Sequence, residues 1–196
     1  MNYKQTYSLL GNMDIYVIDQ ILKERYTTGQ SILDAGCGYG RNLKWFYQNN
    51  FSITGIDTNA DAIKKAQEIY PAAASNFRVG TLEMVPFEEN YFDHIICCAV
   101  LHFADNNTHF NAMVAELVRV LKYSGTLFIR VASNIGLDGK KPFVKDEIND
   151  VVGSFYITRE LIYEISENLP VQLIEAIKTT NVQDIRAMTT LVFQKK

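Results

Sequence analysis

Three glycines on alternate positions, Gly36, Gly38 and Gly40, are the residues whose spacing most plainly predicts chemistry in this chain. They follow the short apolar run 32–34 and precede a helical pattern that begins near Asn42. Glycine allows the backbone to approach a ligand closely because no side chain intervenes. An anionic or polar ligand could then reach the N–H groups that open the helix. The alternative is a tight turn without a ligand.

Two carboxylates end the expected strands beside this turn. Asp34 ends the first strand and is expected to face the opening at the turn, and Asp57 ends the second strand, Ser52–Asp57. A dinucleotide-type fold places a ribose-binding carboxylate about 20 residues after its glycine motif, which is close to the position of Asp57. Both acids could instead serve only as turn or helix-start residues.

The positions of the three histidines predict different roles. His102 follows the apolar run 91–99 and would face the crevice where open parallel sheets bind ligands, so it could accept a proton from a substrate. It could equally be a structural residue of that loop. His94 falls early in the run and is expected to be structural, whereas His109 opens a helix and is expected to be solvated.

The cysteines favour a reducing compartment over a disulfide framework. Their number is odd, and Cys97 and Cys98 are adjacent, so the expected localisation is cytoplasmic. Cys37 is expected to be a small packing residue rather than a reactive thiol. No second cysteine or histidine cluster has metal-ligand spacing, which predicts that there is no metal site.

Length and composition predict one globular domain without a membrane segment. The chain has 196 residues, and its 47% hydrophobic and 21% charged residues are ordinary for such a domain. A net charge of −3 argues against nucleic acid as a generic partner, because phosphate binding needs a basic face, and it leaves a local basic groove open. No window is apolar enough to span a membrane, and the N-terminus lacks a signal-peptide core.

Strand and helix patterns alternate along the chain up to Ala132. Strands are expected at 32–34, 53–56, 77–79, 91–99 and 126–132, the last one after a turn at 123–125. Helices are expected at 13–25, at 42–48, after a cap at Asn59, and at 110–121. This order predicts a parallel sheet with helices on both faces.

The pattern changes after Ala132. Residues 133–157 hold glycines, a proline and mixed charges, and they are expected to form a long loop or lid. Thr158 would then cap a helix, and two strands at 171–177 and 188–194 would pair antiparallel. Several aromatic side chains could close over a substrate or could be ordinary packing residues. They are Tyr3, Tyr7, Phe143, Phe155 and Tyr156.

Taken together, these residues resemble the motifs of the class I S-adenosylmethionine-dependent methyltransferases, in particular small-molecule enzymes similar to the methyltransferase domain 11 and 25 families. The first motif runs from Asp34 to Gly40, and the second is the strand-ending Asp57. Three further motifs cover 80–87 with the following Phe-Asp pair, 97–102, and 119–125. They occur in the family's order on the expected elements.

The resemblance implies an α/β fold with a doubly wound, Rossmann-like sheet of seven strands, mostly parallel with a C-terminal antiparallel strand. It implies one class I methyltransferase domain over 1–196, with 1–30 as an N-terminal helical cap and 133–157 as a possible lid insertion. A monomer and a homodimer are both compatible with it.

The resemblance also implies which residues bind the cofactor, S-adenosyl-L-methionine. The glycine turn would wrap its methionine part and ribose, Asp34 would hold its ammonium group, and Asp57 would hold the ribose hydroxyls. Thr81 stands where the family often has an acid for the adenine amino group, and its hydroxyl can still accept a hydrogen bond. The full implied set is Asp34, Gly36, Cys37, Gly38, Gly40, Asp57, Thr58, Thr81, Leu82 and Cys98.

The implied activity is methyl transfer to a small-molecule acceptor by in-line displacement, with S-adenosyl-L-homocysteine as the product. The run Gly40-Arg41-Asn42 is also similar to the tellurite-resistance and thiopurine-type branches. A thiolate or amine acceptor needs no general base, whereas for a hydroxyl acceptor His102 is the candidate.

Two other functions stay open at this point. Because Thr81 replaces the usual acid, the chain could be a non-catalytic S-adenosylmethionine-binding sensor or scaffold module. It could also be a nicotinamide-dependent oxidoreductase, but that motif wants glycine or alanine where this chain has the bulky Arg41.

Overall fold

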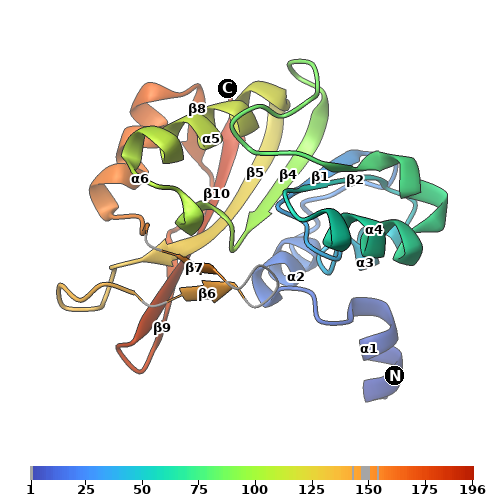
Figure 1. Cartoon of the computed structure of the whole chain (residues 1–196), viewed down its shortest axis with the longest axis horizontal. Coiled ribbons are helices and arrows are strands. Elements are labelled where there is room, and N and C mark those ends of the chain that lie inside the picture. The colour runs from blue at the N-terminus through green and yellow to red at the C-terminus, as the bar shows by residue number, and fades with distance from the viewer. Residues whose placement is uncertain (1, 143, 147–150, 154) are drawn as a thin grey trace.

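A mixed β-sheet forms the centre of the computed structural model, which describes residues 2–142, 144–146, 151–153 and 155–196 (Figure 1). Its strands lie in the order β3-β2-β1-β4-β5-β10-β8, with β9 paired to β10 as an eighth strand of this sheet among the described residues. Their bounds are β1 Ser31–Ala35, β2 Ser52–Asp57, β3 Phe77–Val79, β4 Phe92–Cys98, β5 Leu121–Ser133, β8 Val171–Leu173, β9 Lys178–Val182 and β10 Arg186–Lys195.

The direction of the strands confirms the predicted fold class. Strands β1 to β5 pair in parallel, and β10 is antiparallel to β5, β8 and β9. The chain leaves β1 toward β2 on one side and reaches β4 on the other, so the order reverses between β1 and β4. The carboxyl ends of strands at such a switch point form the usual ligand crevice of an open α/β sheet.

Each face of the sheet packs against its own helices. Leu33 and Ile95 belong to an apolar cluster with α5 (Asn107–Val120) and α6 (Arg159–Asn168). Ile32 and Ile96 belong to a second cluster, with residues of α2 (Ile15–Leu22), α3 (Lys44–Gln48) and α4 (Ala60–Ile69). Successive strand side chains point to opposite faces, so a strand that is apolar at every position must be covered on both sides.

The remaining helices lie before and between the strands. They are α1 Tyr3–Leu10, α2 Ile15–Leu22, α3 Lys44–Gln48, α4 Ala60–Ile69 and two 3-10 turns, η1 Pro71–Asn76 and η2 Leu101–Phe103. The expected caps Asn59 and Thr158 accept from the backbone of Ala62 and Leu161 and so begin α4 and α6. In the described part of the chain, no helix has the length and apolar character that a membrane crossing requires.

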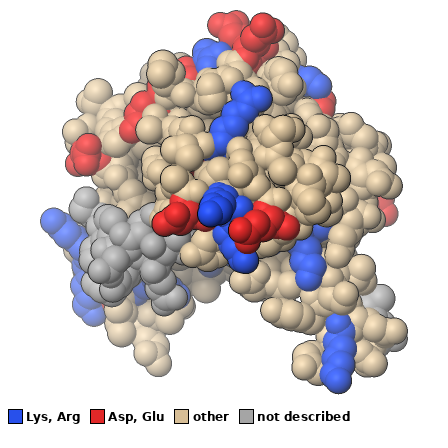
Figure 2. Space-filling view, turned by 45° about the vertical axis from the view of Figure 1, so that its right-hand side comes forward, with Lys and Arg blue, Asp and Glu red and all other residues tan. Residues whose placement is uncertain are grey.

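Helix α1 projects from the body of the molecule (Figures 1 and 2). None of its residues is buried, and Tyr3 and Tyr7 are 77% and 61% exposed. Side chains of α3 hold it, because Lys44 donates to the carbonyl oxygen of Tyr7 and Gln48 donates to that of Ser8. The N-terminal segment is thus helical, as expected, but its first helix is a protrusion.

Two predictions about strands after β4 were wrong. The turn expected at 123–125 lies within β5, where Ser124 has a φ of 62° and the register with β4 shifts between Phe92 and His94. The strand expected at 171–177 ends at Leu173, and a further strand, β9, forms in the segment between the two expected strands. The sequence of β9 has no apolar alternation that would have predicted a strand. It is a strand because it pairs with β10.

The segment expected to form a loop or lid contains a small antiparallel pair, β6 Val144–Asp146 and β7 Val151–Gly153. Phe155 is 8% exposed and stacks on Phe110 with ring centroids 4.8 Å apart, so it belongs to the core and not to a lid surface. Phe143, residues 147–150 and residue 154 lie outside the described residues.

Lys195 provides a test of how the last strand stabilises the fold. Its Nζ donates to the carbonyl oxygens of Val118 and Leu121 at 2.7 and 2.8 Å and to Asn90 Oδ1 at 2.9 Å. We expect Lys195→Met to lower the free energy of unfolding by about 2 kcal/mol, because carbonyls at the end of α5 lose their donor. The measurement is urea unfolding. The exposed neighbour supplies the control, Lys196→Met, and equal midpoints for the two variants would contradict this role.

Candidate functional site

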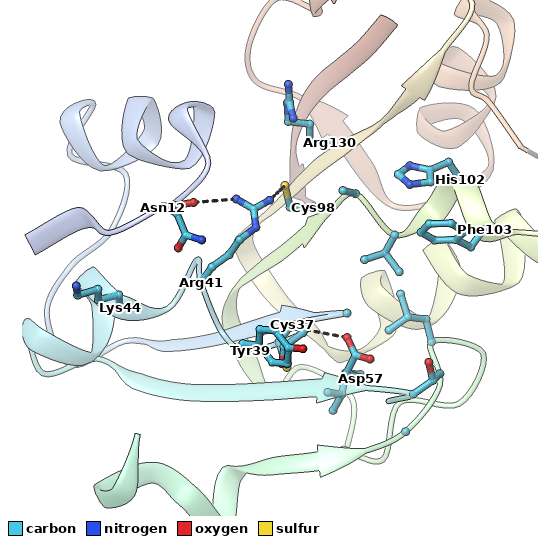
Figure 3. Close-up of a pocket in the computed structure, with 18 of the residues that line it drawn as sticks. Asn12, Cys37, Tyr39, Arg41, Lys44, Asp57, Cys98, His102, Phe103 and Arg130 are labelled. Carbon is cyan, nitrogen blue, oxygen red and sulfur yellow. Dashed lines mark hydrogen bonds between the residues drawn. The ribbon is translucent and has the colours of Figure 1, made fainter. Parts of the chain in front are cut away.

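A cavity of about 1150 Å³ opens at the carboxyl ends of the central strands (Figure 3). It is lined by the segments that follow β1, β2, β3 and β4, by Arg130 of β5 and by Arg186 and Met188 of β10. The link between α1 and α2 closes one end through Gly11 and Asn12. The cavity therefore lies at the switch point of the sheet, where the topology predicts a ligand.

Three successive backbone N–H groups of the glycine turn donate hydrogen bonds to the end of β2. The N–H groups of Gly36 and Cys37 donate to the carbonyl oxygen of Ile56 at 2.8 and 2.9 Å, and that of Gly38 donates to Asp57 Oδ2 at 2.8 Å. These three N–H groups are therefore engaged within the protein, and access of a ligand to the N–H groups that open the following helix stays a prediction. The turn is a rigid wall of the cavity.

Two of the glycines are required by close contacts. Gly36 has a φ of +76°, and a Cβ there would lie 2.2 Å from Val100 Cγ2. Gly40 also has a φ of +76°, and a Cβ there would lie 2.6 Å from the Tyr70 ring. The Tyr70 hydroxyl donates to the Gly40 carbonyl oxygen at 2.6 Å. Gly36 lines the cavity, whereas Gly40 does not and acts through the packing of the turn.

Asp57 links the glycine turn to α4. Its Oδ2 accepts from Gly38, and its Oδ1 accepts from the backbone of Asn59 at 2.9 Å. Both Asp57 and its neighbour Thr58 line the cavity. A carboxylate has about four lone-pair sites, so Asp57 can accept further hydrogen bonds from a ligand.

Asp34 lies beneath the turn and does not face the opening as expected. It is 1% exposed and is not among the lining residues, because the turn it precedes covers it. Neither carboxylate oxygen has a hydrogen-bond partner among the described residues. Burial raises the pKa of Asp34 to about 7; the Arg41 cation opposes this increase, and the Asp57 carboxylate adds to it.

The segment after β3 brings a carboxylate into the cavity that sequence reasoning missed. Thr81 and Leu82 line it as predicted, and Glu83 lines it too. Burial raises the pKa of Glu83, but hydrogen bonds from its own backbone, Thr81 and His109 outweigh burial and leave it lower than usual. His109 Nε2 lies 2.5 Å from Glu83 Oε1, and its side chain is 23% exposed. His109, which was expected to be solvated, is thus partly exposed and partly covered by Glu83.

A polar cluster connects the turn to β4 and β5. Arg41 donates to the Asn12 carbonyl oxygen at 3.2 Å and to the Cys98 sulfur at 3.4 Å (Figure 3). Asp14 Oδ2 accepts from Arg130 at 3.1 Å and from the Cys98 thiol at 3.6 Å. Burial raises the pKa of Cys98 to about 12, and Asp14 contributes to the increase, so this lining residue stays a neutral thiol.

His102 lines the cavity from the 3-10 turn after β4. It is 1% exposed, and its ring centroid lies 4.4 Å from that of Phe103 (Figure 3). A Cβ on Gly153 of β7 would lie 2.8 Å from the His102 ring, so the β6–β7 segment packs directly on the histidine. His94 lies elsewhere, between Thr126 and Gln30, and burial lowers its pKa to about 4.

The sequence analysis did not predict the lining residues from β5 and β10, which are Arg130, Arg186 and Met188. Of these three, Arg130 could have been identified from the sequence, because it is a charged residue inside the apolar strand 127–132. Within the described ranges, no group of three or more histidine, cysteine, aspartate or glutamate side chains could hold a metal ion.

A doubly wound sheet with a glycine turn, a strand-ending acid and a cavity at its switch point defines a domain that binds a nucleoside-type cofactor. Residues 33–129 match the family described as methyltransferase domain, and this region is a class I S-adenosylmethionine-dependent methyltransferase domain. S-adenosylmethionine is the methyl donor of this family.

Two curated proteins are similar to about half of this chain. Phthiotriol/phenolphthiotriol dimycocerosates methyltransferase 1 of Mycobacterium ulcerans is 31% identical over 102 residues, which cover 51% of this chain and 36% of that protein. A tRNA (carboxymethyluridine(34)-5-O)-methyltransferase of Arabidopsis thaliana is 34% identical over 112 residues, which cover 55% of this chain and 25% of that protein. The chain thus spans about a third or less of the length of these relatives.

A solved structure is similar over nearly the whole chain. The TehB-like SAM-dependent methyltransferase from Corynebacterium glutamicum superimposes with a TM-score of 0.65 at 22% identity, covering 98% of this chain and 94% of that one. This likeness establishes the fold of the C-terminal strands, which lie outside the matched family region.

The buried carboxyl of Asp34 gives a pH-dependent prediction. Its folded pKa of about 7 lies above the usual value of 3.8, so the folded state binds more protons between these values. The free energy of unfolding therefore falls as pH rises from 4 to 7, as far as Asp34 contributes. Asp34→Asn removes this loss. The free energy of unfolding of the variant should therefore exceed that of the parent chain by nearly zero at pH 4 and by about 1–4 kcal/mol at pH 8.

Urea unfolding across this pH range measures the difference. Asp61→Asn is the control, because Asp61 is exposed in the first turn of α4. A pH-independent difference between Asp34→Asn and the parent chain would show that the carboxyl is not the titrating group.

Proposed function

We propose that this chain transfers a methyl group from S-adenosylmethionine to a small-molecule acceptor by in-line displacement. The observation that carries the proposal is the glycine turn, whose N–H groups at Gly36, Cys37 and Gly38 already donate to the end of β2. A turn of this kind can cradle a nucleoside, but it has no N–H groups at these positions for a pyrophosphate. This argues against a nicotinamide dinucleotide.

The charges near the turn fit a cationic cofactor. Asp34 holds a buried carboxyl without a partner among the described residues, which an ammonium group close to the turn would stabilise as a carboxylate. Asp57 retains acceptor capacity for ribose hydroxyls. Glu83 stands two residues after Thr81 and supplies an acid for an adenine amino group where the family's usual acid is absent.

The chemistry needs positioning more than activation. When bound, S-adenosylmethionine supplies a methyl group already activated on a sulfonium sulfur, which keeps the bonding electron pair as the acceptor's lone pair forms the new bond. The residues of this chain then have to hold both reactants in line and exclude water. The β6–β7 segment against His102 is the proposed lid, and His102 is the proposed base for a hydroxyl acceptor.

A small acceptor suits the surface. The face in Figure 2 shows acidic and basic side chains interspersed among uncharged ones, without a broad basic area. The net charge of the chain, −3, likewise does not favour binding to a polyanion such as nucleic acid. The names of the two curated relatives span very different acceptors, so the restriction to small molecules rests on this chain's own charges and cavity.

Binding and product formation test the proposal together. Calorimetry with S-adenosylhomocysteine and with NAD should show binding of the first only. Mass spectrometry should then detect methylated products when S-adenosylmethionine is incubated with a panel of thiols, amines and hydroxyl compounds. Binding without transfer to any of them would favour the sensor or scaffold module, which Thr81 in place of the usual acid suggests, and NAD binding alone would reject both.

Asp57 provides a sharper prediction. We expect Asp57→Ala to weaken S-adenosylhomocysteine binding by about 1–3 kcal/mol, because the cavity loses an acceptor for two hydroxyls and the turn loses its partner for Gly38. The measurement is isothermal titration calorimetry. Asp61→Ala, on the exposed face of α4, is the control, and unchanged affinity in Asp57→Ala would refute the role.

A further inference from the structure

The acidic lining residues lie on one side of the cavity, whereas basic lining residues occur both after β1, at Arg41 and Lys44, and on the other side. The carboxylates among its described lining residues, Asp57 and Glu83, come from the ends of β2 and β3. Two guanidinium groups lie across β4 from them, Arg130 on β5 and Arg186 on β10. No described lining residue from β5 or β10 is acidic. The cofactor would occupy the first side, so the second side is the space for the acceptor.

Arg130 is a charged residue in a buried strand. Its neighbours Ile129 and Val131 are fully buried, and its Cα partner on β4 is Cys98, another lining residue. The Arg130 side chain is 19% exposed, and its guanidinium carbon lies 5.2 Å from the centre of the Tyr16 ring. In Figure 3, it lies on the opposite side of the Cys98 sulfur from Arg41. Burying a cation at such a position costs desolvation free energy unless anions or hydrogen-bond acceptors compensate its charge.

Protein groups satisfy this guanidinium only in part. Nη1 donates to Asp14 Oδ2 at 3.1 Å, but Nε is buried and has no hydrogen-bond partner among the described residues. Asp14 is shared, because its Oδ1 caps α2 through the Tyr16 N–H and its Oδ2 also accepts from the Cys98 thiol. Burying an unmet donor costs free energy, which an acceptor oxygen on a bound molecule could recover.

The proposed function adds an electrostatic reason for an anion here. A sulfonium group would bring a further positive charge into a cavity whose lining already includes Arg41, Lys44, Arg130 and Arg186, of which Arg130 is paired with Asp14. Like charges in a partly buried space raise each other's energy, and an anion that binds between them lowers it. A neutral or cationic acceptor would leave this repulsion unrelieved.

We propose that the acceptor carries a carboxylate and that Arg130 binds it, with Arg186 at the rim of the same subsite. A guanidinium suits this group because its planar fork of N–H donors matches the two oxygens of a carboxylate. The carboxylate is an anchor, and the atom that receives the methyl group lies elsewhere on the same molecule. This inference rests on the proposed function and narrows its substrate class.

Calorimetry on the full chain saturated with S-adenosylhomocysteine tests the inference. Four carboxylates of increasing size (glycolate, succinate, benzoate and indole-3-acetate) are each compared with the corresponding amide. At least one carboxylate should bind about tenfold or more tightly than its amide. Arg130→Met should abolish this preference, and Arg130→Lys should weaken it while retaining the charge. Lys65→Met removes an exposed cation of α4 and should change nothing.

The outcomes separate the two proposals. Equal binding of every carboxylate and its amide to the parent chain overturns the inference without any variant, as does an unchanged preference in both Arg130 variants. If the Arg130 variants lose S-adenosylhomocysteine binding instead, the arginine serves the cofactor and the inference is wrong. Failure of the parent chain to bind S-adenosylhomocysteine at all rejects the proposed function and the inference with it.

Discussion

The hydrogen bonds that join the glycine turn to the end of β2 determine the form of the site. Three consecutive N–H groups, from Gly36 to Gly38, are held by Ile56 and Asp57. The turn is therefore a preformed wall, and the position of Asp57 is fixed by the turn as much as by its own strand. A ligand that binds here meets a rigid surface with carboxylates at its edge, and it meets few free N–H donors. The same glycine spacing with free N–H groups would suit a pyrophosphate.

The site has a charge pattern that follows from the sheet order. Acids follow β2 and β3 on one side of the switch point, and Arg130 and Arg186 lie on β5 and β10 on the other side, while Arg41 and Lys44 follow β1 between them. A cation bound against the first side and an anion bound against the second would each meet its complement. Asp34, at the end of β1 beneath the cavity, and Arg130 each keep buried polar atoms without a hydrogen-bond partner in the described part of the chain. Both carry an energetic cost in the isolated chain that bound reactants would reduce.

Most of the fold could be predicted because local signals agreed with one another. Apolar strands, capped helices and the glycine turn all pointed to a doubly wound sheet, and Asp57 was placed at the cavity from its spacing alone. The failures have a common physical cause, which is contact between distant segments. Asp34 is covered by the turn that follows it, His109 is partly buried by Glu83, and β9 is a strand only because β10 pairs with it. No local pattern records such contacts.

Amide chemical shifts would test the central claim most directly. In ¹⁵N-labelled protein titrated with S-adenosylhomocysteine, the largest shifts should fall on the segments that follow β1, β2 and β3, with Gly38 and Thr58 among them. Gly38 should also remain protected from hydrogen exchange in the free protein, because its N–H donates to Asp57. Shifts confined to other parts of the chain, or rapid exchange at Gly38, would contradict the account of a preformed nucleoside-binding wall.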